Sequence, residues 1–167
     1  TPAAIHIISA EDIRRTGVNN LPDALRSVPG LHVYQIDANR WAVSSRGFAS
    51  RFANKMLVMI DGRTVYSPLF SGVYWDAHDI RLEDVERIEV IRGPGGALWG
   101  ANAVNGVINI LTKDAADTQG LSVSMELDNR DTRILSAGYG GWLSGTTAYR
   151  VYGKFSDRAG LPAIFAD

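Results

Sequence analysis

The sequence contains no cysteine, and its charges almost cancel, with 17 basic and 18 acidic side chains in 167 residues. The absence of cysteine excludes a disulfide framework, a zinc–thiolate centre and a thiol nucleophile. The charges are spread evenly along the chain, so we predict no basic surface for nucleic acid. The longest aliphatic run extends from Met56 to Ile60, far short of the ~18 residues that a membrane-spanning helix requires. Taken together, these absences are typical of a globular domain of ordinary size.

Catalytic motifs are absent as well. No serine lies in the G-x-S-x-G setting of a hydrolase, and the glutamates that recur between residues 83 and 89 lie on a predicted strand, where they make a poor acid–base pair. Asp76, His78 and Asp79 lie close together in sequence, but a metal site usually needs a further ligand and a fixed outer shell. For these three side chains we expect a solvated loop. The sequence therefore predicts no enzyme, no metal site and no cofactor.

Glycine, in contrast, is abundant, with 17 residues against an average share of ~7%. Five of these glycines lie between Gly93 and Gly106. A phosphate-binding loop would need Lys and Ser or Thr where Ala101-Asn102 stand, and the dinucleotide pattern G-x-G-x-x-G fails at Leu98. We therefore predict a tight turn with a crowded backbone, which needs residues without a Cβ.

The first 113 residues alternate short helix and strand signals. Ser9 and Asp12 form a capping-box pattern at the start of a helix that is expected to end at Gly17. Asp61-Gly62 follows an apolar run and predicts a hairpin with a type I′ turn. Further strands are predicted at residues 5–8, 31–36, 85–91 and 107–111. Because the elements mix without regular β-α-β spacing, the predicted fold class is α+β.

The pattern changes after Lys113. Residues 114–120 are small and polar and predict a linker, and apolar and polar side chains then alternate strictly from 121 to 128. The alternation returns in residues 135–139, before Gly140-Gly141, and again in residues 149–155. This period of two is typical of membrane β-barrel strands and also of an ordinary antiparallel sheet with one wet face. The pattern alone favours the ordinary sheet.

Several blocks of the sequence, in the same order, resemble the plug domain of TonB-dependent outer-membrane receptors. The longest block extends from Val85 to Ile110 and includes Arg92-Gly93-Pro94. The earlier blocks are Ile7 to Ile13, Leu21 to Leu25, Val28 to Leu31, Ser45 to Phe48 and Ile60 to Gly62. The resemblance covers residues 1–113 and implies a small mixed β-sheet with short helices, lodged inside a barrel. It also implies that residues 121–167, after the linker 114–120, form the first two or three antiparallel strands of a transmembrane β-barrel of about 22 strands.

The resemblance implies energy-coupled uptake of a scarce nutrient across the outer membrane of a Gram-negative bacterium. The ligand would be a small molecule or metal chelate of the ferric siderophore, haem or cobalamin class. TonB would act through a box upstream of residue 1. Because this sequence includes neither that box nor most of the barrel, we expect a receptor fragment that does not transport by itself. The alternative is a free-standing periplasmic or secreted binding module of the same fold.

The resemblance also implies roles for individual residues. Arg46 and Arg92 would anchor the plug by pairing with glutamates of the barrel wall. Loops 49–54 and 66–76 would lie at the apex, where their side chains either face the ligand or pack the plug's own loops. The predicted ligand-facing residues are Arg51, Tyr66, Phe70, Tyr74 and Trp75. The predicted structural turn glycines are Gly47, Gly62, Gly93, Gly100 and Gly106.

Strands cut from a barrel would expose unpaired edges and an apolar face. For residues 121–155 we therefore expect disorder, folding back onto the plug, or self-association with a second copy of the chain.

Overall fold

The computed structural model describes residues 4–37, 40–45, 56–67, 72–93, 99–100, 103–127 and 132–158. The chain divides into two compact units. The first comprises Thr1–Tyr34 and Trp41–Lys113, and the second comprises Asp114–Asp167 together with the short segment Gln35–Arg40.

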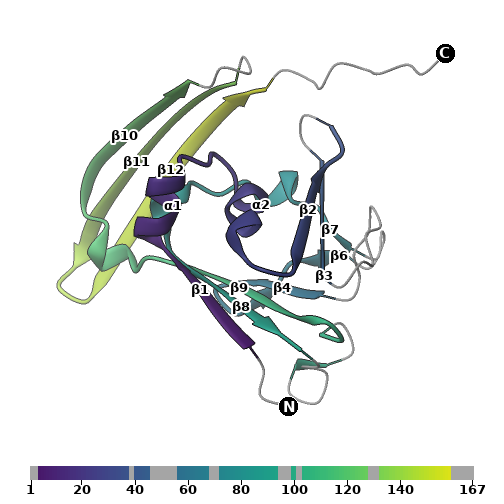
Figure 1. Cartoon of the computed structure of the whole chain (residues 1–167). Helices are drawn as coiled ribbons and strands as arrows, with labels where there is room; N and C mark the ends of the chain where they lie inside the picture. Colours follow the sequence, from purple (N-terminus) through teal and green to yellow (C-terminus); the bar gives the residue numbers. More distant parts are fainter. Residues whose placement is uncertain are drawn as a thin grey trace. The chain divides into compact units, whose positions relative to one another are not determined.

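A five-stranded mixed sheet forms the centre of the first unit (Figure 1). Its strands, in spatial order, are β1 (Ala4–Ser9), β8 (Val85–Arg92), β9 (Gly106–Thr112), β4 (Met56–Ile60) and β5 (Arg63–Thr64). The β4–β9 pair is parallel and the other pairs are antiparallel. This arrangement confirms the predicted α+β class with a small mixed sheet.

Short helices connect the strands of this unit. They are α1 (Ala10–Thr16), α2 (Leu21–Ala24), and the 3₁₀ turns η1 (Leu25–Ser27), η2 (Asp76–His78) and η3 (Leu82–Asp84). The capping box predicted before α1 is present, since Asp12 N donates to Ser9 Oγ at 3.1 Å and Ser9 N donates to the Asp12 carboxylate at 3.1 Å. Gly17 ends α1 with a left-handed φ of 64°. None of the helices in the described part of the chain is both long and apolar enough to cross a membrane.

The hydrophobic core lies between one face of the sheet and the elements that cover it. The helices contribute Ile13, Leu21 and Leu25, which cluster with Ile88 and Ile110 of the sheet. Two small two-stranded sheets accompany the central sheet: β2 (Leu31–Gln35) pairs with β3 (Trp41–Ser45), and β6 (Tyr66–Ser67) pairs with β7 (Gly72–Val73).

The turn between β4 and β5 has the predicted geometry. Asp61 and Gly62 have φ angles of 48° and 76°, both positive as a type I′ turn requires. The Asp61 carboxylate also accepts hydrogen bonds from Thr112 N at 2.8 Å and from Thr112 Oγ1 at 2.9 Å. Since Asp61 N donates to the Ile110 carbonyl at 2.9 Å, this one residue both shapes the hairpin and ties it to the end of β9.

The second unit is a three-stranded antiparallel sheet that begins after η4 (Ala115–Asp117). Its strands are β10 (Gly120–Leu127), β11 (Arg133–Ser144) and β12 (Thr147–Asp157), which lie side by side in that order (Figure 1). Residues 121–127, 133–144 and 147–155 are therefore strands, so disorder, one of the three outcomes expected for this region, does not apply to them.

The strand β11 continues through Gly140-Gly141, and the turn follows at residues 145–146. A Cβ at Gly140 would lie 2.0 Å from the Thr118 carbonyl oxygen, and one at Gly141 would lie 2.6 Å from Tyr149 Oη. These two glycines therefore do not end the strand. They let the preceding segment and a neighbouring ring lie directly against it.

Candidate functional site

The side chain of Arg92 lies at the C-terminal end of β8. Its Nη1 donates a hydrogen bond to the carbonyl of Pro29, which is 63 residues earlier in the chain. Its Nε is buried without a hydrogen-bond partner. Within the described ranges no carboxylate forms an ion pair with this guanidinium. Arg92 is thus a fixed, partly buried cation whose charge is not compensated by the part of the chain that the structure describes.

Three glycines surround this position, and all have positive φ angles: 79° at Gly30, 129° at Gly93 and 150° at Gly106. A Cβ at Gly30 would lie 3.0 Å from Arg92 Nη1, and one at Gly106 would lie 2.3 Å from the Ile91 carbonyl oxygen. Gly93 N donates to the Asn105 carbonyl at 3.2 Å, which joins the two ends of the glycine-rich segment. A side chain at position 106 would therefore clash with the backbone of β8, and one at position 30 would press on the Arg92 guanidinium.

The other residues of the predicted set are placed as follows. Arg46, Gly47, Arg51 and Phe70 lie outside the described residues, so their predicted roles stay predictions. Gly62 and Gly100 have φ angles of 76° and 88°.

The predicted ligand-facing aromatics differ in burial. Tyr66 pairs with Val73 between β6 and β7, and both Tyr66 and Tyr74 are half-buried. Trp75 is only 6% exposed and belongs to the hydrophobic core. Trp75 therefore packs in the core of this unit, and for the other apical side chains the two readings stay open.

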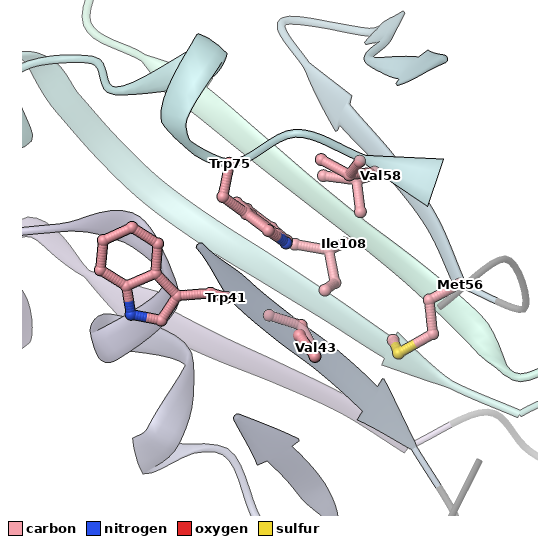
Figure 2. Close-up of a pocket in the computed structure, with 8 residues that line it drawn as sticks. Trp41, Val43, Met56, Val58, Trp75 and Ile108 are labelled. Atoms are coloured by element: carbon pink, nitrogen blue, oxygen red, sulfur yellow. The ribbon is translucent and has the colours of Figure 1, made fainter. Parts of the chain in front are cut away.

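Trp75 lines a small apolar hollow beside the sheet (Figure 2). Trp41 and Val43 of β3 and Met56 of β4 lie around the same hollow, with Val58 and Ile108. The labelled side chains offer aliphatic groups, a thioether and two indole rings, and no charge. This hollow is therefore a gap in the packing of the hydrophobic core, between β3 and the central sheet.

Titratable groups do not gather into a reactive cluster in the described ranges, where no three His, Asp or Glu side chains are placed to hold a metal ion. Asp76 and His78 form the 3₁₀ turn η2, in which no residue is buried. The pKa of Asp12 is lowered to about 2, first by its hydrogen bond with Ser9 and then by Arg15. A hydrogen bond from Arg14 lowers the pKa of Glu11. Both carboxylates interact with neighbours on or beside α1. Their lowered pKa values therefore reflect contacts that stabilise this helix, and they do not indicate a reaction centre.

The sheet of the second unit has two chemically opposite faces. Its exposed face is apolar, and the cross-strand register aligns Leu121 with Tyr139 and Val151, and Met125 with Leu135 and Phe155. The exposed fractions along β10 are 75% for Leu121, 63% for Val123, 69% for Met125 and 68% for Leu127.

The opposite face of that sheet is mostly polar, and it also carries the buried Ile134. Ser124 Oγ and Ser136 Oγ are hydrogen-bonded at 2.7 Å, and Lys154 is the cross-strand neighbour of Ser136. This order is the reverse of a sheet in water, where the apolar face turns inward. An exposed apolar band of this kind marks a surface that contacts another protein or a membrane.

One buried cation was not predicted from the sequence. Arg81 is 1% exposed and lies 3.7 Å from the Asp84 carboxylate and 3.8 Å from that of Glu83. Lys113 fixes the same turn, because its Nζ donates to the Glu83 carbonyl at 2.7 Å and its N donates to the Asp84 carbonyl at 2.8 Å. The signal available in the sequence was the pair of acids two and three positions after Arg81, but such spacing is common on exposed turns.

Comparison with known proteins identifies a family for the first unit. The family model described as "TonB-dependent Receptor Plug Domain" matches residues 1–107. The vitamin B12 transporter BtuB of Vibrio vulnificus is 36% identical over 125 residues, which cover 74% of this chain and 20% of that protein. The ferric enterobactin receptor of Pseudomonas aeruginosa is 33% identical over 172 residues, covering 91% of this chain and 23% of the receptor.

Comparison with solved structures points to the same family of receptors. The siderophore receptor PirA from Pseudomonas aeruginosa superposes with a TM-score of 0.66 at 31% identity, covering 93% of this chain and 28% of that one. This chain therefore spans between a fifth and a quarter of the length of the curated relatives that it matches. By sequence and by fold it belongs to the plug-domain family of TonB-dependent receptors, the outer-membrane receptors of Gram-negative bacteria.

Proposed function

We propose that residues 1–113 are the plug of a TonB-dependent receptor, residues 114–120 the linker, and residues 121–167 the first strands of its barrel. The receptor would gate energy-coupled uptake of a scarce nutrient, and the plug would bind and block rather than catalyse. One observation carries this proposal: in the same chain, a unit of the plug family is followed by a sheet whose exposed face is apolar.

The alternative of a free-standing binding module fits that sheet poorly. In water, each exposed Leu, Val or Met side chain forgoes about 1.5–3 kcal/mol of burial. A lipid-facing position removes this cost for the side chains of the apolar face, while the serines and Lys154 would face a wet lumen.

Arg92 supports the plug role from the other unit. A guanidinium held in place without a carboxylate partner in the described part of the plug is suited to pair with an acidic group on another element. We propose that this partner is a glutamate of the barrel wall and that Arg46 acts in the same way. The ordering of the guanidinium before pairing reduces the entropy that the contact costs.

The ligand is proposed from the relatives, which are named as a vitamin B12 transporter, a ferric enterobactin receptor and a siderophore receptor. We propose a ligand of the same broad class, a metal chelate such as a cobalamin or ferric siderophore, or haem. Tyr66 and Tyr74, with Arg51 and Phe70, are the plug residues proposed to face it. TonB is the proposed partner that supplies energy.

The test is uptake by the complete receptor in cells that lack their own transporters for these ligands. Radiolabelled cobalamin, ferric enterobactin and haem are supplied separately, with and without deletion of the TonB box. We expect accumulation of one ligand and its loss on deletion, while binding of that ligand to whole cells remains. Scrambling an equally long stretch beside the box is the matched control. Uptake that survives the deletion would refute the energy-coupled mechanism.

A further inference from the structure

We propose that the Pro29-Gly30 turn is a cradle that positions the guanidinium of Arg92 for its carboxylate partner. The inference rests on the anchoring role given to Arg92 above. It adds two residues to that role which have no charge and lie 63 and 62 positions away in sequence.

The turn itself explains why its carbonyl is available. Leu31 N donates to the Val28 carbonyl at 3.2 Å, so residues 28–31 form a β-turn. Pro29 occupies the second position and Gly30, with φ at 79°, occupies the third, which is the pattern of a type II turn. The turn's own hydrogen bond uses Val28, and the carbonyl of Pro29 is left to accept from Arg92 Nη1.

Gly30 provides the space for that contact. The position where its Cβ would stand lies 3.0 Å from Arg92 Nη1, which is tighter than nine in ten real Cβ contacts. Any larger residue would push on the guanidinium as well as strain the turn. Glycine at this position therefore serves two purposes: it allows the positive φ angle, and it leaves the guanidinium where it lies.

The acceptor is neutral, and this matters for function. A carboxylate in place of the Pro29 carbonyl would hold Arg92 equally well but would cancel its charge. The carbonyl restricts the side chain and leaves the positive charge available for an acidic partner. The cradle thus fixes the geometry of the anchor without competing for it.

The experiment compares Gly30→Ala with Gly62→Ala in the complete receptor. Gly62 has nearly the same φ angle, 76°, but nothing lies within 4 Å of where its Cβ would stand. The two substitutions therefore impose a similar backbone strain, and only one touches Arg92. Gly30→Asn is the second variant, because Asn tolerates the left-handed region and assembles at lower backbone cost.

The readout is leakage through the plugged pore, measured as ion conductance in planar bilayers beside Arg92→Ala. We expect G30A and G30N to reproduce most of the leak of R92A, and G62A to match the wild type. The double variant G30A/R92A should leak no more than R92A alone, since a merely structural role for Gly30 would give additive effects.

Crystal structures of the G30A and G30N receptors separate this inference from the anchoring role. A guanidinium displaced from the Pro29 carbonyl supports the cradle, and one that stays in place overturns it. If it is displaced but R92A itself does not leak, the turn still holds the guanidinium, but the anchoring role falls and with it the purpose proposed for the cradle. Additive leaks of G30A and R92A would also overturn the cradle.

Discussion

The two units use the same kinds of residue in opposite ways. In the first, Leu25 is fully buried at 0% exposure, and the sheet turns Val85, Ile88 and Val90 toward the core. In the second, Leu121 is 75% exposed, and the buried positions of β11 include Ser136. Hydrophobic patterning therefore identifies which side chains share a face, but the environment decides whether that face is the inside or the outside.

The difference also explains why the composition looks so ordinary. A strand with one apolar and one polar face averages to a mean hydropathy near zero, and the mean for the whole chain is −0.05. The first unit instead combines a buried apolar core with exposed charged side chains.

The largest expected effect comes from making one chemical change in both environments. Leu25→Ala should lower the free energy of unfolding by about 2–5 kcal/mol, because it leaves a cavity in a packed core. Leu121→Ala should cost less than about 1 kcal/mol in detergent, since its side chain lines no packed interior. Urea unfolding of the complete receptor, followed by tryptophan fluorescence, measures both. Equal losses at the two positions would contradict the comparison.

A charge placed on either face of β10 gives the next test. Val123→Lys sets an ammonium on the apolar face and should destabilise the receptor in lipid vesicles by about 2–4 kcal/mol if that face meets the bilayer. Ser122→Lys lies one residue away on the polar face and should change stability by less than about 1 kcal/mol. The folded fraction in vesicles across a urea series measures this difference. If Ser122→Lys lowers the stability of the receptor as much as Val123→Lys does, the assignment of the two faces is refuted.

Glycines in β11 and in the following turn allow a finer comparison. Gly140→Ala would place a Cβ 2.0 Å from the Thr118 carbonyl oxygen, and such overpacking costs about 1–3 kcal/mol. Gly145→Ala, with nothing within 4 Å of its Cβ position, should change stability by no more than about 0.5 kcal/mol. Thermal unfolding of both variants decides whether the close approach is needed, and unchanged melting of G140A would show that it is not.

The smallest effect concerns the capping box of α1. The pKa of Asp12 falls from its usual 3.8 to about 2 in the folded chain, mainly through the hydrogen bond with Ser9. Its contribution to stability is therefore complete above about pH 4 and is lost as the pH falls through about 2. Asp12→Asn lacks this titration, so the stability difference between wild type and D12N should shrink as the solution is acidified through that range. Denaturant titrations at a series of pH values measure the difference, and a difference that grows on acidification would contradict the assignment.

Local chemistry made part of the fold predictable. The capping box at Ser9 and Asp12 and the turn at Asp61-Gly62 follow from interactions between residues at most three apart, so the sequence displays them directly. The resemblance of several sequence blocks to the plug domain then indicated the family and drew attention to Arg92.

Long-range partners were not predictable in the same way. β1 pairs with β8 across about 80 residues, and Arg92 finds its acceptor 63 residues away. Neither partner shows a local pattern, because a backbone carbonyl belongs to every residue. The sequence also cannot show that Thr118 and Tyr149 approach Gly140 and Gly141.

The alternation in β10, β11 and β12 has a consequence for how this region tolerates genetic change. Substituting one residue alters one position on one face, but deleting one codon from β10 would exchange the two faces for every residue on one side of the deletion. The turn at Gly145 and Thr146 lies between strands and is exempt from this constraint. Short in-frame insertions should therefore be accepted at that turn and rejected a few residues away, and an epitope tag placed there would leave the pairing of β11 with β12 intact.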